Sequence, residues 1–173
     1  METFRKYHIN AMQFYDWHWK HHRPYCSDGT YNEIFNRKVS TQVVKDYIRE
    51  VQGIGSKAMF YNLAYGALKD GKEDGVKPEW QVYIDSTHVS PYRHVLKYGK
   101  SDIFIQNPAN TEWQDYLVKR TREVYQNFNF DGFHVDQLGS APGYHVMENG
   151  HKVEKASRLS TKDGKEVLLW DGY

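Results

Sequence analysis

The most regular feature of the chain is a segment in which apolar residues recur at helical spacing. It begins after Ser40, a favoured N-cap residue, and Gly53 follows the last apolar position. Five residues between them share one face of a helix: Val43, Val44, Tyr47, Ile48 and Val51. The pattern predicts an amphipathic helix whose apolar face packs against a core.

A second and clearer helical pattern starts at Asn110, another favoured N-cap residue, and ends at Phe128. Its apolar and semi-polar positions are Trp113, Tyr116, Leu117, Thr121, Val124 and Tyr125. Because Trp113 and Tyr116 lie on the amphipathic face, we expect both rings to belong to the core rather than to a binding site.

Four short apolar segments have the length and composition of strands. They are His8–Trp17, Lys57–Ala64, Asp102–Gln106 and Phe130–Leu138. Helical patterns separate most of them, and strands that alternate with helices form βαβ units with right-handed crossovers and a parallel sheet. The pattern therefore predicts an α/β fold with four parallel strands.

The stretch between Ala64 and Asp102 is rich in Gly, Lys and Tyr and interrupts this alternation. Within it, Glu79–Asp85 is a candidate for an extra strand and Ser90–Leu96 for a helical turn. We interpret the stretch as a long loop insertion after the second strand. Since no repeat, low-complexity tract or linker is visible, residues 1–173 are expected to form one domain, too short for the ~250 residues of a complete eight-unit α/β barrel.

Charge and aromatic content narrow the kind of partner. Lys and Arg number 23 against 22 Asp and Glu, so the chain has no charge excess to hold a nucleic acid or a membrane surface. Fourteen Tyr, eight Phe and five Trp make up 16% of the residues in an otherwise polar chain. Such rings suit sugars, which are neutral and partly apolar, although core packing and protein interfaces use the same residues.

Other sequence features argue against membrane, redox and metal chemistry. No apolar stretch approaches the ~20 residues that span a bilayer, and METFRKYHIN lacks the apolar region of a signal peptide, so we expect a soluble chain. Cys26 is the only cysteine, which excludes an internal disulfide and favours a buried, inert thiol. His18, His21 and His22 follow Asp16, but their spacing matches no standard zinc motif. We expect surface or sugar-contacting histidines there, with no metal.

Each predicted strand ends in polar or aromatic residues, and ligands of parallel sheets bind beyond these carboxyl ends. The four exits are Tyr15-Asp16-Trp17, Tyr61-Asn62, Gln106-Asn107-Pro108 and His134-Val135-Asp136-Gln137. Core packing is the alternative role for Trp17, Tyr61 and Asn62, but their place at the exits favours contact with a ligand.

Along the last strand, the period of two predicts which side chains face the site. Gly132, His134 and Asp136 share one face, while Phe133 and Val135 share the other and would pack under helices. Asp136 would lie at the mouth of the site. Asp131 precedes the strand and is expected to form local hydrogen bonds instead. For His134, a core position and a contact with a sugar hydroxyl remain open.

Four segments resemble the first half of the catalytic barrel of glycoside hydrolase family 66. They are INAMQFYDWHWKHHRP, KAMFYNLAYGA, IFIQNPANTEWQDYL and FDGFHVDQLG, in the same order over nearly all of residues 8 to 139. That family contains endo-dextranases and cycloisomaltooligosaccharide glucanotransferases. The resemblance implies a (β/α)8 TIM barrel, of which this chain would supply about four βα units, and cleavage of α-1,6-glucan with retention.

The resemblance also implies roles for residues. Asp136 matches the aspartate nucleophile after the fourth strand, no cofactor is needed, and the location implied is extracellular or at the cell surface. The residues expected to hold the sugar are Asp16, Trp17, Tyr61, Asn62, Asn107 and His134. The partner implied is an α-glucan. Hydrolysis and ring-forming transfer remain open, because water and a sugar hydroxyl compete for the same glycosyl-enzyme.

The general acid/base of the family is a glutamate on a later strand. Glu148, Glu154 and Glu166 follow Asp136, but they lie in a polar segment that does not have a strand pattern. We therefore expect an N-terminal part of a barrel that lacks its acid and is inactive alone. A half-barrel that only binds glucan is the alternative, and its open sheet edges would favour self-association.

Overall fold

The computed structural model describes residues 2–84, 90–136, 145–146, 152–153 and 159–167. The chain divides into two compact units. The first unit contains residues 1–63 and 119–136, and the second contains residues 64–118 and 137–173. The single domain expected from the sequence stays a prediction, and each unit is described by itself.

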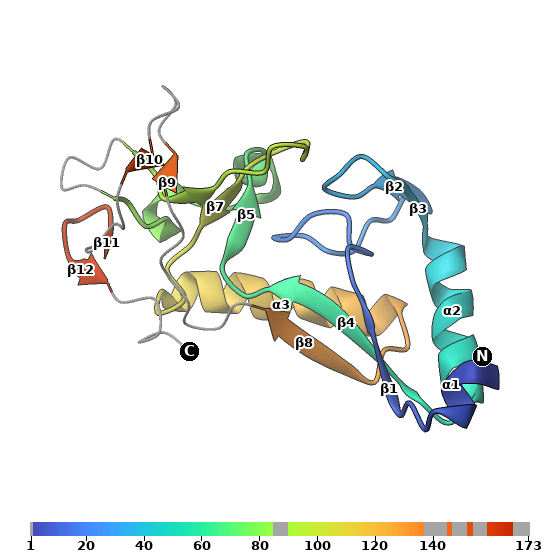
Figure 1. The fold of residues 1–173 in the computed structure, drawn as a ribbon. Coiled ribbons are helices and arrows are strands. Elements are labelled where there is room, and N and C mark those ends of the chain that lie inside the picture. The colour runs from blue at the N-terminus through green and yellow to red at the C-terminus, as the bar shows by residue number, and fades with distance from the viewer. Residues whose placement is uncertain (1, 85–89, 137–144, 147–151, 154–158, 168–173) are drawn as a thin grey trace. The chain divides into compact units, whose positions relative to one another are not determined.

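The first unit carries a parallel sheet. Its elements are α1 (Glu2–Lys6), β1 (Ala11–Phe14), β2 (Thr30–Asn32), β3 (Lys38–Ser40), α2 (Thr41–Gly53), β4 (Lys57–Leu63) and β8 (Gly132–Asp136). The strand order in the sheet is β1-β4-β8, with both pairings parallel, so β4 is central and β1 and β8 form the edges (Figure 1). β2 and β3 form a separate antiparallel hairpin.

The parallel sheet is made of fewer strands than the sequence predicts. Among the described residues it contains three parallel strands rather than four, because β4 pairs directly with β8. The segment expected as the third parallel strand, Asp102–Gln106, forms β7 (Ile103–Ile105) in an antiparallel sheet of the second unit. A short apolar run with β-branched residues fits either kind of sheet, so the pattern identified the strand but not its partners.

The α2 helix forms where the pattern predicts. The Ser40 side chain accepts a hydrogen bond from the Val43 amide, which satisfies one of the donors left free at a helix start. Val44, Ile48 and Val51 are buried, as expected. Val43 and Tyr47, which the pattern also assigned to the apolar face, are 49% and 58% exposed, so for these two residues the expectation is wrong.

The core of the first unit is aromatic. The Trp17 ring meets the edges of its neighbours, with centroids 5.0 Å from those of Phe128 and Phe130 and 5.8 Å from that of Phe60. Phe133 stacks on Phe60 at 4.5 Å. The other members of the buried cluster are Val44, Ile48, Val51, Ala58 and Val124.

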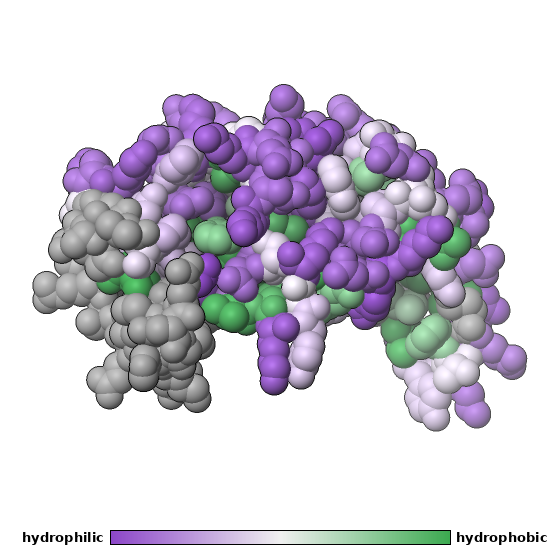
Figure 2. Space-filling model, turned by 90° about the horizontal axis from the view of Figure 1, so that it is seen from above, coloured by the Kyte–Doolittle hydropathy of each residue, from purple (hydrophilic) through white to green (hydrophobic). Residues whose placement is uncertain are grey.

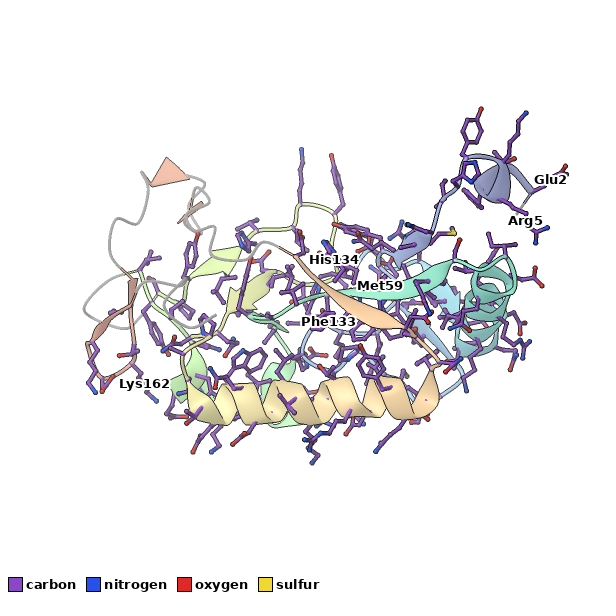
Figure 3. All side chains as sticks on the ribbon, turned by 90° about the horizontal axis from the view of Figure 1, so that it is seen from below. Glu2, Arg5, Met59, Phe133, His134 and Lys162 are labelled. Atoms are coloured by element: carbon purple, nitrogen blue, oxygen red, sulfur yellow. The ribbon has the colours of Figure 1, made fainter. Side chains whose placement is uncertain are left out.

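The alternation predicted along β8 is confirmed. Phe133 packs against the core, while His134 lies on the opposite side of the strand (Figure 3). The end of the Met59 side chain fills the space beside Gly132: a Cβ atom built there would lie 2.5 Å from Met59 Cε, so a larger residue would require this methionine to move.

The second unit contains short antiparallel strands and turns. Its elements are β5 (Gly66–Leu68), η1 (Gly71–Asp74), η2 (Pro78–Trp80), β6 (Arg93–His94), β7, β9 (His145–Val146), β10 (Lys152–Val153), β11 (Leu159–Ser160) and β12 (Glu166–Val167). β7 pairs with β5 and β6. The expected helical turn at Ser90–Leu96 is wrong, because Arg93 and His94 pair with β7. The extra strand expected at Glu79–Asp85 forms only in part: η2 overlaps its start, Gln81 and Tyr83 form isolated antiparallel bridges, and Asp85 lies outside the described residues.

The α3 helix (Thr111–Asn127) confirms the second helical pattern. The Asn110 side chain accepts a hydrogen bond from the Trp113 amide at 3.0 Å, which is the predicted N-cap. Trp113 is fully buried and packs with Trp80 and Tyr116, so the core role expected for Trp113 and Tyr116 is also confirmed. Residues up to Val118 belong to the second unit, and the rest of the helix belongs to the first.

Hydrophilic side chains cover most of the face shown in Figure 2, with smaller hydrophobic areas between them. This agrees with the mean hydropathy of -0.82. In the part of the chain that the structure describes, no helix is long and apolar enough to cross a membrane. Cys26 is buried, as the sequence suggested.

Candidate active site

The candidate site is centred on Asp136, the last residue of β8. The Tyr61 hydroxyl donates a hydrogen bond to Asp136 Oδ2 at 3.2 Å, and β4 supplies this tyrosine from the neighbouring strand. Burial raises the pKa of Tyr61, and a hydrogen bond with Tyr15 and the negative charge of Asp136 raise it further. The phenol therefore stays protonated and can orient the carboxylate of Asp136 at any pH in the physiological range.

Tyr15 is a part of the site that the candidate residues from the sequence did not include. Its ring lies 4.2 Å from the ring of Tyr61, centroid to centroid, yet 61% of the residue is exposed. An exposed ring on a buried ring is the arrangement that stacks against a flat, partly apolar ligand. The signal was present in the sequence, because Tyr15 directly precedes Asp16 at the end of the first predicted strand.

His134 faces the same side as Asp136 and is exposed. Its ring lies 6.3 Å from that of Tyr61, the residue opposite it in the sheet. Among the described residues His134 is therefore not part of the core, and a contact with a sugar hydroxyl stays a prediction. His134 can therefore reach a ligand at this face.

Asn62 and the nearby histidines have internal roles. Asn62 Oδ1 lies 2.8 Å from His21 Nδ1, and Asn62 Nδ2 donates to the His21 carbonyl oxygen at 2.8 Å. Asn62 is only 1% exposed, and His18, His21 and His22 are also buried. The expectation of surface histidines is therefore wrong, because this segment folds inward and uses the imidazole of His21 to satisfy the amide of Asn62.

Trp17 belongs to the core that supports the site. It is 3% exposed, and its indole N–H donates to the Tyr61 carbonyl oxygen at 3.3 Å. This bond links the end of the first strand to β4 at the residue that contacts Asp136. Little of the ring is left to meet a sugar, so the structure gives Trp17 the packing role that was the alternative at the sequence level.

Asp16 lies next to Tyr15 and has an unusual backbone. Its φ of 49° lies in the left-handed region, which Asp adopts more readily than most other side chains. Burial raises the pKa of Asp16, while the Arg37 guanidinium, 2.8 Å from its Oδ2, opposes the rise. The strand exit thus presents a second carboxylate, fixed by a cation from the β2–β3 loop.

The remaining predicted residues lie elsewhere in the chain. Asn107 belongs to the second unit, where its Oδ1 accepts a hydrogen bond from the Ala109 amide at 3.0 Å and shapes the turn before α3. Glu166 lies in β12 of that unit, and Glu148 and Glu154 lie outside the described residues. The structure thus brings Tyr61, His134 and Asp136 together on the neighbouring strands β4 and β8, and Asp16 lies in the same unit with its carboxylate bound to Arg37.

Asp131, at the other end of the β8 segment, forms hydrogen bonds as expected, but its partners are distant in the sequence rather than local. Its carboxylate accepts hydrogen bonds from Gln52 Nε2, the Ala58 amide and Lys57 Nζ, at 2.9, 2.9 and 3.0 Å. These bonds tie the start of β8 to α2 and β4. They lower the pKa of Asp131 to about 2, the hydrogen bond from Gln52 having the largest effect.

Replacing Asp131 with Asn is expected to lower the free energy of unfolding by about 1–2 kcal/mol at neutral pH, because hydrogen bonds to a charged acceptor are lost. The pKa of this carboxyl is lower in the folded chain than the usual 3.8, so its contribution is complete above about pH 4 and is lost as the pH falls toward about 2. Urea unfolding across this range measures it. Asp28→Asn, at an exposed position, is the control, and an equal effect of both changes would refute the role of Asp131.

Comparison with known proteins identifies the family of the chain. The sequence profile of glycosyl hydrolase family 66 matches residues 1–163. The chain belongs to glycosyl hydrolase family 66. The resemblance noted from the sequence is thereby confirmed, over more of the chain than the four segments that first suggested it.

Two curated members of family 66 illustrate the relationship. A cycloisomaltooligosaccharide glucanotransferase from Niallia circulans is 31% identical over 159 residues, which cover 89% of this chain and 16% of the relative. A dextranase from Streptococcus salivarius is 22% identical over 183 residues, covering the whole chain and 21% of the relative. The chain thus spans about a fifth of the length of these family 66 enzymes.

Solved structures agree with the assignment to family 66. A cycloisomaltooligosaccharide glucanotransferase from Paenibacillus sp., solved with cycloisomaltoheptaose, matches with a TM-score of 0.78 at 30% identity. The match covers 94% of this chain and 22% of that protein. The maltogenic α-amylase AmyB from Thermotoga neapolitana matches with a TM-score of 0.56 at 20% identity, over 82% of this chain and 34% of that protein, which shows likeness of fold alone.

Proposed function

We propose that this chain is the nucleophile-bearing part of a retaining glycoside hydrolase that acts on α-1,6-glucan. The observation that carries the proposal is the hydrogen bond from the buried Tyr61 hydroxyl to Asp136 at the end of β8. Membership of family 66 and the similarity to a dextranase support the substrate class. The sheet β1-β4-β8 is proposed to be a segment of a (β/α)8 barrel.

The chemistry assigns one role to each residue. Asp136 attacks the anomeric carbon and forms a glycosyl-enzyme, while the glycosidic oxygen takes a proton from a second carboxyl. Tyr61 donates to the carboxylate that attacks and so fixes its orientation. Asp16 and His134 are proposed to hold sugar hydroxyls, Asp16 as an acceptor. Water then releases the sugar and regenerates Asp136.

Retaining enzymes need their two carboxyl groups about 5–5.5 Å apart, one to attack and one to act as acid and base. We propose that the acid/base is a glutamate of the rest of the barrel. The site also requires no cofactor for this reaction, because carboxyl groups perform every proton transfer and covalent step. An extracellular location is proposed on the same grounds as the substrate, since a polymer such as dextran is degraded outside the cell.

A second candidate is transfer of the glycosyl group to the far end of the same glucan chain, which forms a ring. The observation that favours it is the 31% identity to the Niallia circulans cycloisomaltooligosaccharide glucanotransferase, compared with 22% to the dextranase. Both reactions share Asp136 and its glycosyl-enzyme and differ only in whether water or a sugar hydroxyl accepts the sugar. Analysis of products from dextran as linear or cyclic oligosaccharides distinguishes the two.

Binding of isomaltotriose to the 173-residue chain tests the proposed site. Asp16→Asn is expected to weaken binding by about ten-fold, because it removes a charged acceptor while Asn tolerates the left-handed backbone. Tyr61→Phe is expected to change binding by less than about three-fold, because its hydroxyl contacts Asp136 rather than the sugar. Isothermal calorimetry measures both effects.

The matched controls lie on α2. Among the described residues Asp46 bonds with Gln42 and Arg49 of the same helix, and Tyr47 is exposed. Asp46→Asn and Tyr47→Phe are expected to leave the affinity unchanged. The absence of measurable binding by the unsubstituted chain would contradict the proposed site, and so would a loss of affinity in the α2 variants equal to that of Asp16→Asn.

A further inference from the structure

The loop of the β2–β3 hairpin is held in one shape by the carboxylate of Glu33. This side chain is 1% exposed. It accepts hydrogen bonds from the amides of Phe35 and Arg37, at 3.0 and 2.8 Å, and from Arg37 Nε and Nη2, at 3.0 and 3.2 Å. A backbone bond from the Glu33 amide to the Arg37 carbonyl oxygen closes the turn at 3.0 Å.

These contacts fix the guanidinium as well as the turn. Burial alone would raise the pKa of Glu33, but the hydrogen bonds from Arg37 and Phe35 outweigh it and hold the pKa below its usual value. Glu33 is therefore ionised, and its two oxygens form a bidentate pair with Nε and Nη2 of Arg37. The same Nη2 atom reaches Asp16 Oδ2 at 2.8 Å.

The hairpin is attached to the end of the first strand at two adjacent residues. The Tyr31 hydroxyl donates a hydrogen bond to the Trp17 carbonyl oxygen, and Arg37 binds the side chain of Asp16. Burial raises the pKa of Tyr31, so this phenol stays a donor. These two hydrogen bonds fix the backbone at Trp17 and the direction of the carboxylate at Asp16, the residue whose φ is 49°.

We propose that the β2–β3 hairpin is a positioning element of the active site, in which Glu33 holds Arg37 and Arg37 holds the Asp16 carboxylate toward the sugar. The inference rests on the proposed role of Asp16 as a sugar contact. Glu33 and Arg37 act through Asp16, so they are positioning residues. A non-glycine backbone in the left-handed region costs free energy unless neighbouring contacts hold it, and the bonds of Arg37 and Tyr31 to Asp16 and Trp17 provide such contacts.

A simple role in stability fits the geometry less well. The Arg37 side chain is 62% exposed, so water and salt screen its charge and reduce what its pair with Asp16 adds to folding. The Asp16 side chain is only 12% exposed and has its direction set by this single cation. The ion pair therefore mainly orients the Asp16 carboxylate, and this orientation affects the binding of a ligand more than the stability of the folded chain.

A double-mutant cycle on the 173-residue chain tests the proposal, with isomaltotriose as the ligand and calorimetry as the readout. Arg37→Gln and Asp16→Asn are each expected to weaken binding about ten-fold. Arg37→Lys is expected to bind more tightly than Arg37→Gln but more weakly than the unsubstituted chain, because an ammonium cannot form the two-nitrogen contact with Glu33. In the double variant Asp16→Asn with Arg37→Gln, binding is expected to be no more than about two-fold weaker than in Asp16→Asn, because Arg37 acts through Asp16.

Two further readouts separate positioning from general damage. Arg49→Gln is the matched control, since it removes an arginine that pairs with an aspartate on α2, and it is expected to leave affinity unchanged. The Asp16 carboxyl, followed by NMR during a pH titration, is expected to titrate at higher pH in Arg37→Gln. Arg37→Gln leaves the buried Glu33 carboxylate without its cation and is expected to unfold at a lower temperature than Arg49→Gln, so affinities are compared at a temperature where thermal unfolding shows every variant to be folded.

The outcomes distinguish this inference from the proposed function. If the loss of affinity in the double variant equalled the product of the losses in the two single variants, the inference would be overturned, because Arg37 would then act independently of Asp16. Unchanged affinity in Arg37→Gln would also overturn it while the proposed function stands. If the unsubstituted chain bound no isomaltotriose, the proposed function itself would fail, and the sugar-facing role of the hairpin with it.

Discussion

Asp136→Asn is expected to lower the rate of dextran cleavage by about 10⁴-fold in a protein that carries these 173 residues within a complete barrel. The amide retains the shape of the side chain but cannot form the glycosyl-enzyme, and removal of a catalytic nucleophile commonly has an effect of this size. The fold is expected to be unchanged, because the Asp136 side chain forms one hydrogen bond among the described residues, from Tyr61, at the edge strand β8. Reducing-sugar assays and circular dichroism measure the two effects.

Two variants in the same barrel calibrate this result. Asp131→Asn makes the same chemical change at the other end of the same segment and is expected to affect stability with little effect on turnover. Tyr61→Phe is expected to lower turnover by about ten-fold, because the carboxylate of Asp136 loses the donor that orients it. Near-full activity in Asp136→Asn would show that another residue attacks the sugar.

The sequence was most informative where several local signals agreed. Ser40 and Asn110 cap the two helices, and the apolar spacing after each cap gave the buried faces of α2 and α3. The alternation in β8 correctly separated Phe133 from His134, because a strand with one buried face has only one register that buries its apolar residues. Local propensity and burial point to the same answer in these elements.

Strand pairing could not be predicted in the same way. Ile103 and Ile105 made β7 recognisable as a strand, but its antiparallel pairing with β5 and β6 depends on residues far apart in the sequence. The β2–β3 hairpin was missed because it is polar and each strand has only three residues. Its turn is stabilised by the side chain of Glu33, a device that leaves no periodic pattern.

The candidate site was predicted in outline but not in the role of each residue. Position at a strand exit correctly brought Tyr61 and Asp136 together, but it could not show that Tyr61 is buried and hydrogen-bonded to that carboxylate. Trp17 and Asn62 share such exits and are nearly fully buried. Arg37 contacts Asp16 across 21 positions in the sequence, and only the fold of the hairpin brings them together.

The 173-residue chain alone is expected to show no dextranase activity. A retaining enzyme needs a second carboxyl about 5–5.5 Å from the nucleophile, and the parallel sheet of the described residues has three strands, too few to close a barrel around one. The edges β1 and β8 leave backbone groups free to pair with another chain, so self-association is expected in gel filtration.

Activity is expected to return when the rest of a family 66 barrel is supplied, because that part would close the sheet and bring the acid/base glutamate. Mixing the chain with the remaining barrel of the Niallia circulans glucanotransferase, and assaying dextran cleavage, is the direct measurement. The same mixture with Asp136→Asn is the control, since recovered activity must depend on this carboxylate. Strong hydrolysis by the purified monomeric chain would contradict the expectation and would direct the search for the acid to Glu148, Glu154 and Glu166.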